Sequence, residues 1–248
     1  MILARRDDRL GVPRQALAVS GGWGARLRAL RGAICLAAIA VAPGWAAAAA
    51  WPREEGGSFL SFTLRSTLDG PDFGDYASLY YEYGLTEKLT FGLDVGGNIA
   101  NGQTTAIAFL RHPVFQGDGP DVFALSLGVG VTDRPGGASA TLRPGFSWGR
   151  PISGRWGSGW LGIESTFALY DDGGSLAKIE GTFGINHANG SLTILQAILS
   201  DPSGGSHELA IEAAHVFKIA DRSFVELGLS YEFRQRTTVA KLGVWQSF

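Results

Sequence analysis

Regular alternation of large apolar residues with small or polar ones runs through most of this chain after residue 50. The segment 89–96, LTFGLDVG, is the clearest example, because every second side chain in it is large and apolar. Successive side chains of a β-strand point to opposite faces, so this period predicts strands and not helices. No segment after residue 50 shows a sustained helical period. The pattern therefore predicts an all-β fold.

Clusters of Gly, Asp, Asn, Pro and Ser divide the alternating region into twelve predicted strands, because these residues favour turns. The segments are centred on residues 58–66, 76–84, 88–97, 104–112, 121–132, 139–149, 159–170, 175–186, 190–200, 207–217, 223–233 and 237–248. The segment 192–199 is the least regular, since it is apolar on both faces. An alternative with ten strands and two wrongly divided hairpins stays open.

The two faces of the predicted strands indicate the environment of the sheet. One face is large and apolar, and the other carries Gly, Ser, Thr, Ala and charged residues. A soluble barrel with so polar an interior would leave its apolar face uncovered, whereas a transmembrane barrel turns that face to lipid. Backbone groups in lipid must be paired within the protein, which requires closure of the sheet. We therefore expect a closed antiparallel transmembrane β-barrel over residues 51–248.

Aromatic residues gather near the predicted strand ends, where membrane barrels carry aromatic girdles at the two lipid–water interfaces. The expected girdle residues are Tyr81, Tyr83, Trp148, Trp156, Trp160, Tyr231, Phe233, Trp245 and Phe248.

The first 50 residues differ from the rest in charge. They contain seven Arg and two Asp, a balance of +5, whereas residues 51–248 contain 14 Lys and Arg against 21 Asp and Glu, a balance of −7. Three arginines between residues 26 and 31 precede the apolar stretch 32–42, and Pro43-Gly44 and an alanine run follow. This order predicts an N-terminal extension and cleavable signal peptide over residues 1–50. A transmembrane anchor is the alternative, but the apolar stretch is short for a span of about 20 residues.

Cleavage near Trp51 would remove Cys35, the single cysteine of the chain. The remaining protein would then form no disulfide, perform no thiol catalysis and hold no thiolate-bound metal. We expect no cofactor and no metal, because the four histidines lack metal-ligand spacing. The acidic balance of residues 51–248 also disfavours nucleic acid as a partner.

The last predicted strand ends in Phe248, and Val244 and Leu242 continue the alternation of apolar residues, whereas Gln246 departs from it. With these residues the strand resembles the C-terminal signal of Gram-negative outer-membrane barrels. The resemblance implies an outer-membrane location, reached through export. It also implies that the barrel-insertion machinery recognises this strand.

A finer resemblance lies in the segment 81–93, YEYGLTEKLTFGL. It is similar to a hairpin of the barrel family linked to the phenol-degradation meta-pathway, whose members are regarded as outer-membrane transporters. The resemblance implies transport, but a hairpin of this kind identifies no solute.

The sequence GFSWG at 145–149 matches the G-x-S-x-G pattern of hydrolases, with Ser147 in the place of the nucleophile. That pattern requires a strand-to-helix turn, whereas here it continues the strand alternation. His207 by a predicted loop is the other candidate for catalysis. We expect no enzymatic activity, and an outer-membrane hydrolase is the least favoured alternative.

Alternation also predicts which charged side chains point into the lumen. The predicted lumen-lining charges are Arg65, Glu82, Asp94, Arg143, Glu164, Lys178, Glu180, Glu208, Glu212, Glu226, Glu232 and Lys241. Arg143, Glu164 and Lys178 lie on three consecutive predicted strands, so we expect them to form an interior network. The excess of acids predicts a porin-like passive channel for small solutes with a mild preference for cations. A closed structural or adhesion barrel, with charges that only hold the wall together, is the alternative.

Overall fold

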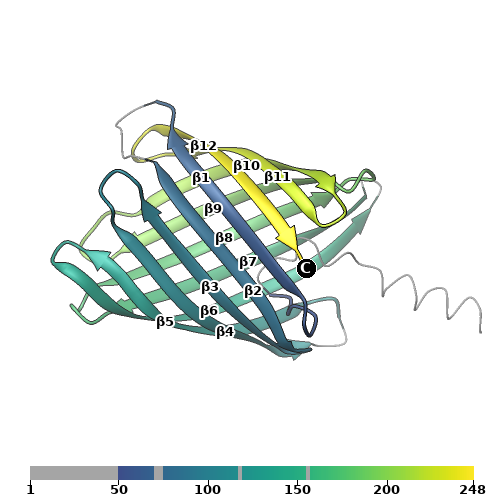
Figure 1. Ribbon diagram of the computed structural model, residues 1–248, viewed down its shortest axis with the longest axis horizontal. Helices are drawn as coiled ribbons and strands as arrows, with labels where there is room; N and C mark the ends of the chain where they lie inside the picture. Colours follow the sequence, from purple (N-terminus) through teal and green to yellow (C-terminus); the bar gives the residue numbers. More distant parts are fainter. Residues whose placement is uncertain (1–49, 70–74, 117–118, 155–156) are drawn as a thin grey trace, which may run out of the picture. The chain divides into compact units, whose positions relative to one another are not determined.

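Twelve β-strands close into one antiparallel barrel, in which every strand pairs with its neighbours along the chain and β1 pairs with β12 (Figure 1). The computed structural model describes residues 50–69, 75–116, 119–154 and 157–248, so the expected signal peptide lies outside the described residues. The expectation of a closed all-β barrel with twelve strands is confirmed. No helix among the described residues is long and apolar enough to cross a membrane. The strands are β1 (Ser58–Thr67), β2 (Tyr76–Thr86), β3 (Leu89–Asn98), β4 (Thr104–Gln116), β5 (Val122–Arg134), β6 (Gly137–Gly154), β7 (Gly157–Tyr170), β8 (Ser175–Asn186), β9 (Leu192–Pro202), β10 (Glu208–Ala220), β11 (Ser223–Glu232) and β12 (Thr237–Ser247).

Two strands continue past their predicted ends at residues 112 and 149, and each includes a proline beyond that point. β4 runs on from Pro113 to Gln116, and its register with β5 shifts between Pro113 and Phe115. β6 includes Pro151, which lies opposite Trp160 of β7. A proline removes one backbone donor, which a bulge can accommodate. The pairing with the neighbouring strand then resumes, so these prolines do not terminate the strands.

The outer wall of the barrel is apolar over all twelve strands. Its exposed side chains include Phe62, Leu79, Val95, Leu127, Ile163 and Leu229. Contiguous apolar surface of this extent is rare on soluble monomers and is typical of a lipid-facing barrel wall. The predicted assignment of the two faces agrees with this wall.

Both ends of the described chain lie at one end of the barrel, which we call the base; the opposite end is the mouth. At the base, the backbone N–H of Phe248 donates to the carbonyl oxygen of Ser58 at 3.0 Å. Gln246, which departs from the apolar pattern of the last strand, accepts a hydrogen bond from the Ser223 hydroxyl at 2.6 Å. A hydroxyl group of the neighbouring strand thus satisfies the hydrogen-bonding capacity of this polar side chain.

The prediction of an aromatic girdle is wrong for two tryptophans. Trp160 is only 6% exposed and lies inside the barrel, and Trp245 packs against the same interior cluster. Side chains alternate between the two faces of a strand. Leu161 and Val244 point outward, so their sequence neighbours Trp160 and Trp245 point inward. Trp156 lies outside the described residues.

Several inward-facing aromatic rings lie flat against glycines of adjacent strands. A Cβ atom added to Gly184 of β8 would fall 2.2 Å from the Trp160 ring, and one added to Gly92 of β3 would fall 2.1 Å from the Phe109 ring. Glycine leaves the space that each ring occupies. The inward glycines therefore let large side chains narrow the lumen.

Candidate functional site: the barrel lumen

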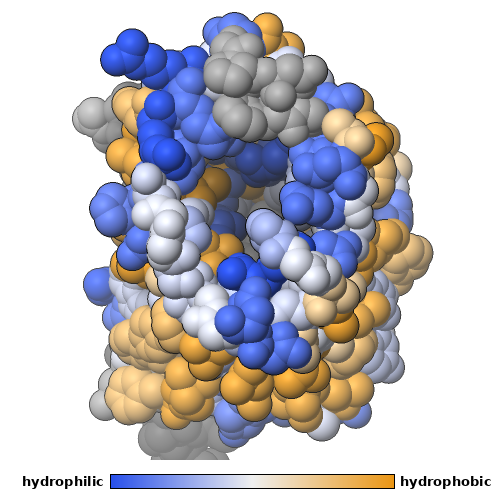
Figure 2. Space-filling model, turned by 90° about the vertical axis from the view of Figure 1, so that its left-hand side faces the viewer, coloured by the Kyte–Doolittle hydropathy of each residue, from blue (hydrophilic) through white to orange (hydrophobic). Residues whose placement is uncertain are grey.

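The lumen holds a cavity of about 650 Å³ that is hollowed from the mouth. Figure 2 shows the mouth with a hydrophilic rim and an apolar outer wall. The polar and charged side chains that line the cavity are Arg53, Ser61, Thr63, Arg65, Tyr76, Ser78, Tyr80, Glu82, Asp94, Glu164, Thr166, Lys178, Glu180, Thr182, Gln196, Ser200, Glu208, Glu226, Glu232 and Lys241. A polar lumen within an apolar wall is suited to a hydrated, polar or charged solute.

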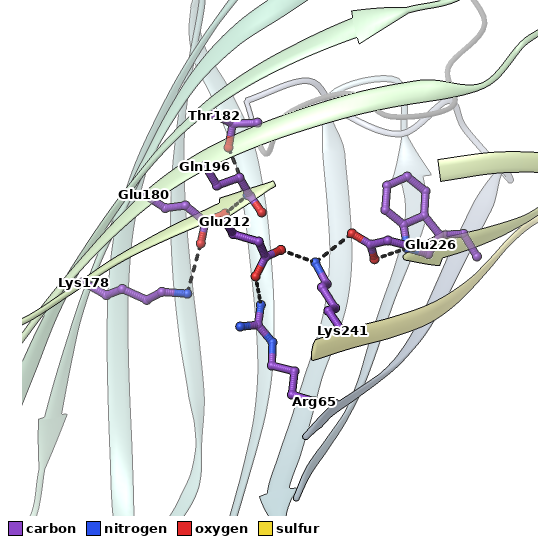
Figure 3. Close-up of polar contacts among 9 residues, drawn as sticks. Arg65, Lys178, Glu180, Thr182, Gln196, Glu212, Glu226 and Lys241 are labelled. Atoms are coloured by element: carbon purple, nitrogen blue, oxygen red, sulfur yellow. Dashed lines mark hydrogen bonds and ion pairs between the residues drawn. The ribbon is translucent and has the colours of Figure 1, made fainter. Parts of the chain in front are cut away.

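One ionic network joins the two chain-terminal strands to β10 and β11 (Figure 3). Glu212 of β10 accepts a hydrogen bond from Arg65 of β1 at 2.7 Å and one from Lys241 of β12 at 2.6 Å. Lys241 also contacts Glu226 of β11 at 2.7 Å, and the indole N–H of Trp245 donates to Glu226 at 3.1 Å. Glu212 and Glu226 are almost fully buried. Their charges are compensated by these partners, so the network ties together the strands at which the barrel closes.

A second group lies on β8 and β9. The Lys178 ammonium contacts the Glu180 carboxylate at 3.1 Å along β8. From β9, the Gln196 amide donates to Glu180 and to the Thr182 hydroxyl. Glu164 of β7 lies directly opposite Glu180 and forms no salt bridge within the described part of the chain. Two carboxylates therefore face one another on this wall, and among the described residues only Glu180 forms a salt bridge.

A third network surrounds Glu82 of β2. The Arg111 guanidinium contacts Glu82 at 2.7 Å, and Tyr80 donates to the same carboxylate at 2.6 Å. Arg53, which precedes β1, also donates to Glu82 from its Nε. Glu82 and Arg111 are both buried. Three donors thus satisfy one carboxylate in a site that water scarcely reaches.

The N-terminal segment, residues 50–57, lies at the base of the barrel, with residues 50–53 inside it and residues 54–56 exposed. The Trp51 ring packs over Gly149 of β6, and the backbone N–H of Arg53 donates to the Thr90 hydroxyl at 3.0 Å. The N–H of Gly56 donates to the carbonyl oxygen of Gly84 at 2.9 Å. A Cβ atom on Gly84 would fall 2.0 Å from the carbonyl oxygen of Glu54, so the segment requires glycine at this position of β2.

The N-terminal segment meets an apolar cluster at the base. The cluster consists of Trp160, Leu192, Ile194, Val216 and Phe224, with Trp51 and Trp245 packed against it. The lumen therefore changes from polar walls at the mouth to apolar filling at the base. Residues 192–199 are apolar on both faces because the inward face of β9 enters this cluster.

Each of the twelve charges predicted to line the lumen points inward by strand parity. Eleven of them line the cavity or form the ionic contacts described above, and the twelfth, Arg143, contacts Asp94 at 2.7 Å. Glu232 lines the cavity near the mouth. The structure adds Arg53 and Arg111, which alternation did not identify. These two arginines change the net charge of the inward set from −4 to −2.

The expected network of Arg143, Glu164 and Lys178 does not form among the described residues. Arg143 pairs with Asp94, and Lys178 pairs with Glu180. Glu164 lies opposite Ser147 of β6, four residues along the strand from Arg143. Adjacent strands bring the three residues to one wall, but Arg143 lies too far along the barrel axis from Glu164, and Lys178, two residues from the position opposite Glu164, forms its salt bridge with Glu180 instead.

The hydrolase pattern has no catalytic geometry around it. Ser147 is buried within β6, which continues as a strand to Gly154. His207 contacts Asp201 at 3.0 Å, and both side chains are exposed at the mouth. No cluster of three or more potential metal ligands occurs in the described ranges.

The turn between β7 and β8 carries an ordered carboxylate at the mouth. The backbone N–H of Gly174 donates to Asp172 at 2.8 Å, and Arg134 donates to it at 2.6 Å. The Gly174 hydrogen bond and the Arg134 guanidinium lower the pKa of Asp172 below its ordinary value. This carboxylate therefore stays charged in moderately acidic solution.

No protein-family model matches the chain. No curated protein matches it either. Among solved structures it is similar to the KdgM porin, with a TM-score of 0.55 and 10% identity over 77% of this chain and 99% of that chain. The KdgM porin in complex with disordered oligogalacturonate gives a TM-score of 0.56 at 10% identity over the same shares. The chain has the fold of an outer-membrane β-barrel. An outer-membrane channel from Pseudomonas putida F1 has a TM-score of 0.48 and 11% identity, over 84% of this chain and 100% of that chain.

Proposed function

We propose that this protein is an outer-membrane channel that passes small solutes passively through its lumen. The observation that carries the proposal is the cavity of about 650 Å³, open at the mouth and lined by charged and hydroxyl side chains. The apolar outer wall would face lipid, and export through the N-terminal extension would bring the chain to the outer membrane. The resemblance of the segment 81–93 to the meta-pathway-linked family supports transport and names no solute.

The lumen favours cations over anions in this proposal. The inward charges remain acidic after Arg53 and Arg111 are counted, and Glu164 and Glu232 have no salt-bridge partner among the described residues. An unpaired carboxylate attracts a passing cation and repels an anion. Paired charges contribute little, because each carboxylate is compensated by its partner.

Planar-bilayer recording of refolded protein tests the proposal. The protein should give discrete conductance steps, and a folded sample can be recognised by its altered gel migration before boiling. A correctly folded barrel that stays electrically silent would contradict the channel function.

A closed structural barrel is the second candidate, and one observation favours it. The N-terminal segment and the apolar cluster at the base fill the lumen across from the open mouth. The same recording separates the candidates, since a closed barrel gives no conductance in the wild type and gains it only when this filling is removed.

A further inference from the structure

An apolar groove of about 850 Å³ lies in the outer wall of the barrel. Its floor is low because Ser66, Ala213 and Ala240 are small, whereas Leu64, Leu227, Leu229 and Leu242 stand around them. Strand pairing places Ser66 opposite Ala240, Ala240 opposite Leu229, and Leu229 opposite Ala213. Three small residues and Leu229 therefore lie in one row that crosses β1, β12, β11 and β10, and Leu229 stands between Ala240 and Ala213.

The groove ends at a polar cluster made of His187, Thr193 and His215. The Thr193 hydroxyl lies 2.8 Å from Nε2 of His187 and 3.0 Å from Nδ1 of His215. Thr193 and His215 also line the groove itself. A hydroxyl can donate to one imidazole and accept from the other, so in either arrangement one ring N–H remains for another acceptor.

Register places the two ends of the groove at different depths. Ser66 is next to the last residue of β1, toward the mouth, whereas Thr193 is the second residue of β9, at the base. From β1 to β9 the groove crosses four strand spacings, about 19 Å in all. Because barrel strands are tilted by about 40°, the groove descends by a height comparable with one leaflet of a ~30 Å hydrocarbon core.

The polar cluster faces outward at the base. Thr193 and His215 lie opposite one another in the register of β9 with β10, and His215 shares the outward face of β10 with the exposed residues Ala213 and Phe217. Outward-facing polar side chains are costly in hydrocarbon, so this end of the wall belongs to the headgroup region.

We propose that the groove binds one acyl chain of a phospholipid from the periplasmic leaflet, with the lipid phosphate at His187 and His215. This inference rests on the proposed placement of the barrel in the outer membrane, with the base and the chain ends that it holds on the periplasmic side. The apolar groove accepts the chain, and the ring N–H that remains in the polar cluster donates to the phosphate. The polar cluster selects the periplasmic leaflet, because it lies at the base.

Native mass spectrometry of the refolded full chain in phosphatidylglycerol–detergent micelles tests the site. The wild type should retain one phosphatidylglycerol through a detergent wash. Ala213→Phe fills the groove and should weaken retention about tenfold. Ala197→Phe is the matched control, because Ala197 is an exposed outward residue of β9 that does not line the groove. It should retain the lipid as the wild type does.

A second arm separates the phosphate contacts from the apolar contacts. The double variant His187→Ala/His215→Phe should lose phosphatidylglycerol but keep diacylglycerol, which has no phosphate. Equal retention by all variants would overturn the proposal and show annular lipid only. A change of oligomeric state in Ala213→Phe at unchanged lipid retention would also overturn it, in favour of a second copy in the groove.

The placement of the barrel in a membrane is measured independently of lipid binding in the groove. Altered gel migration and insertion into vesicles report on the barrel, and conductance reports on the channel, whereas lipid retention reports on the groove. A variant that inserts and conducts like the wild type but loses the lipid supports the groove alone.

Discussion

Arg53, in the segment that precedes β1, donates a hydrogen bond from its Nε to the buried carboxylate of Glu82 on β2. The Arg53 guanidinium also lies 4.6 Å from the centre of the Phe59 ring. Glu82 keeps a second cationic partner in Arg111. The contact thus fastens the N-terminal segment to the lumen wall, while the wall itself does not depend on it.

We expect Arg53→Ala to increase the conductance of the channel. A hydrogen bond to a charged group contributes about 1.5–3 kcal/mol, so its loss should raise the undocked population of the segment more than about tenfold. Single-channel recording measures the change. Glu54→Gln is the control, because Glu54 is an exposed residue of the same segment. Equal conductance of the two variants would show that the segment does not limit the pore.

Replacing Glu212 with Gln should destabilise the barrel strongly. Arg65 and Lys241 both contact this buried carboxylate, and its neutralisation leaves a cation without compensation. Breaking a buried pair in this way costs about 3–5 kcal/mol. Urea unfolding in detergent, followed by the gel-migration shift, measures the loss. Glu164→Gln should have little effect on stability, since Glu164 forms no salt bridge among the described residues. A similar loss in both variants would contradict the structural role of the network.

Gly184→Val should disturb the packing at the base, because the Trp160 ring occupies the space of a side chain at that position. Overpacking of this kind costs about 1–3 kcal/mol. Near-ultraviolet circular dichroism should report the displaced indole, together with a lower unfolding midpoint. Gly181→Val is the matched control on the same strand, since a Cβ atom there meets nothing within 4 Å. An unchanged tryptophan spectrum in Gly184→Val would mean that the indole packs elsewhere.

The strands and their inward charges could be predicted because side chains alternate with a period of two residues. Once one side chain of a strand is assigned to the inner or outer face, the faces of the others follow. Arg111 was not predicted to face the lumen because β4 is apolar on both faces, with Ile107 and Phe109 buried inside the barrel, so the sequence does not distinguish its inner face. Arg53 was not predicted because it precedes the first strand, where the alternation does not apply. Alternation gives a direction for each side chain but no height along the barrel axis. The partner of Arg143 therefore followed only from the structure, which brings Asp94 within reach from β3.

Neutralising Glu164 should reduce the proposed preference of the channel for cations. Glu164 lines the cavity, and no salt bridge among the described residues compensates its charge. A unit charge at 4 Å changes the free energy of a monovalent ion in water by about 1 kcal/mol, so the K⁺ to Cl⁻ permeability ratio should fall several-fold in Glu164→Gln. The reversal potential across a KCl gradient measures the ratio. Glu87→Gln, in the exposed turn between β2 and β3, should leave the ratio unchanged. A reversal potential that stays at its wild-type value in Glu164→Gln would mean that another group sets the selectivity.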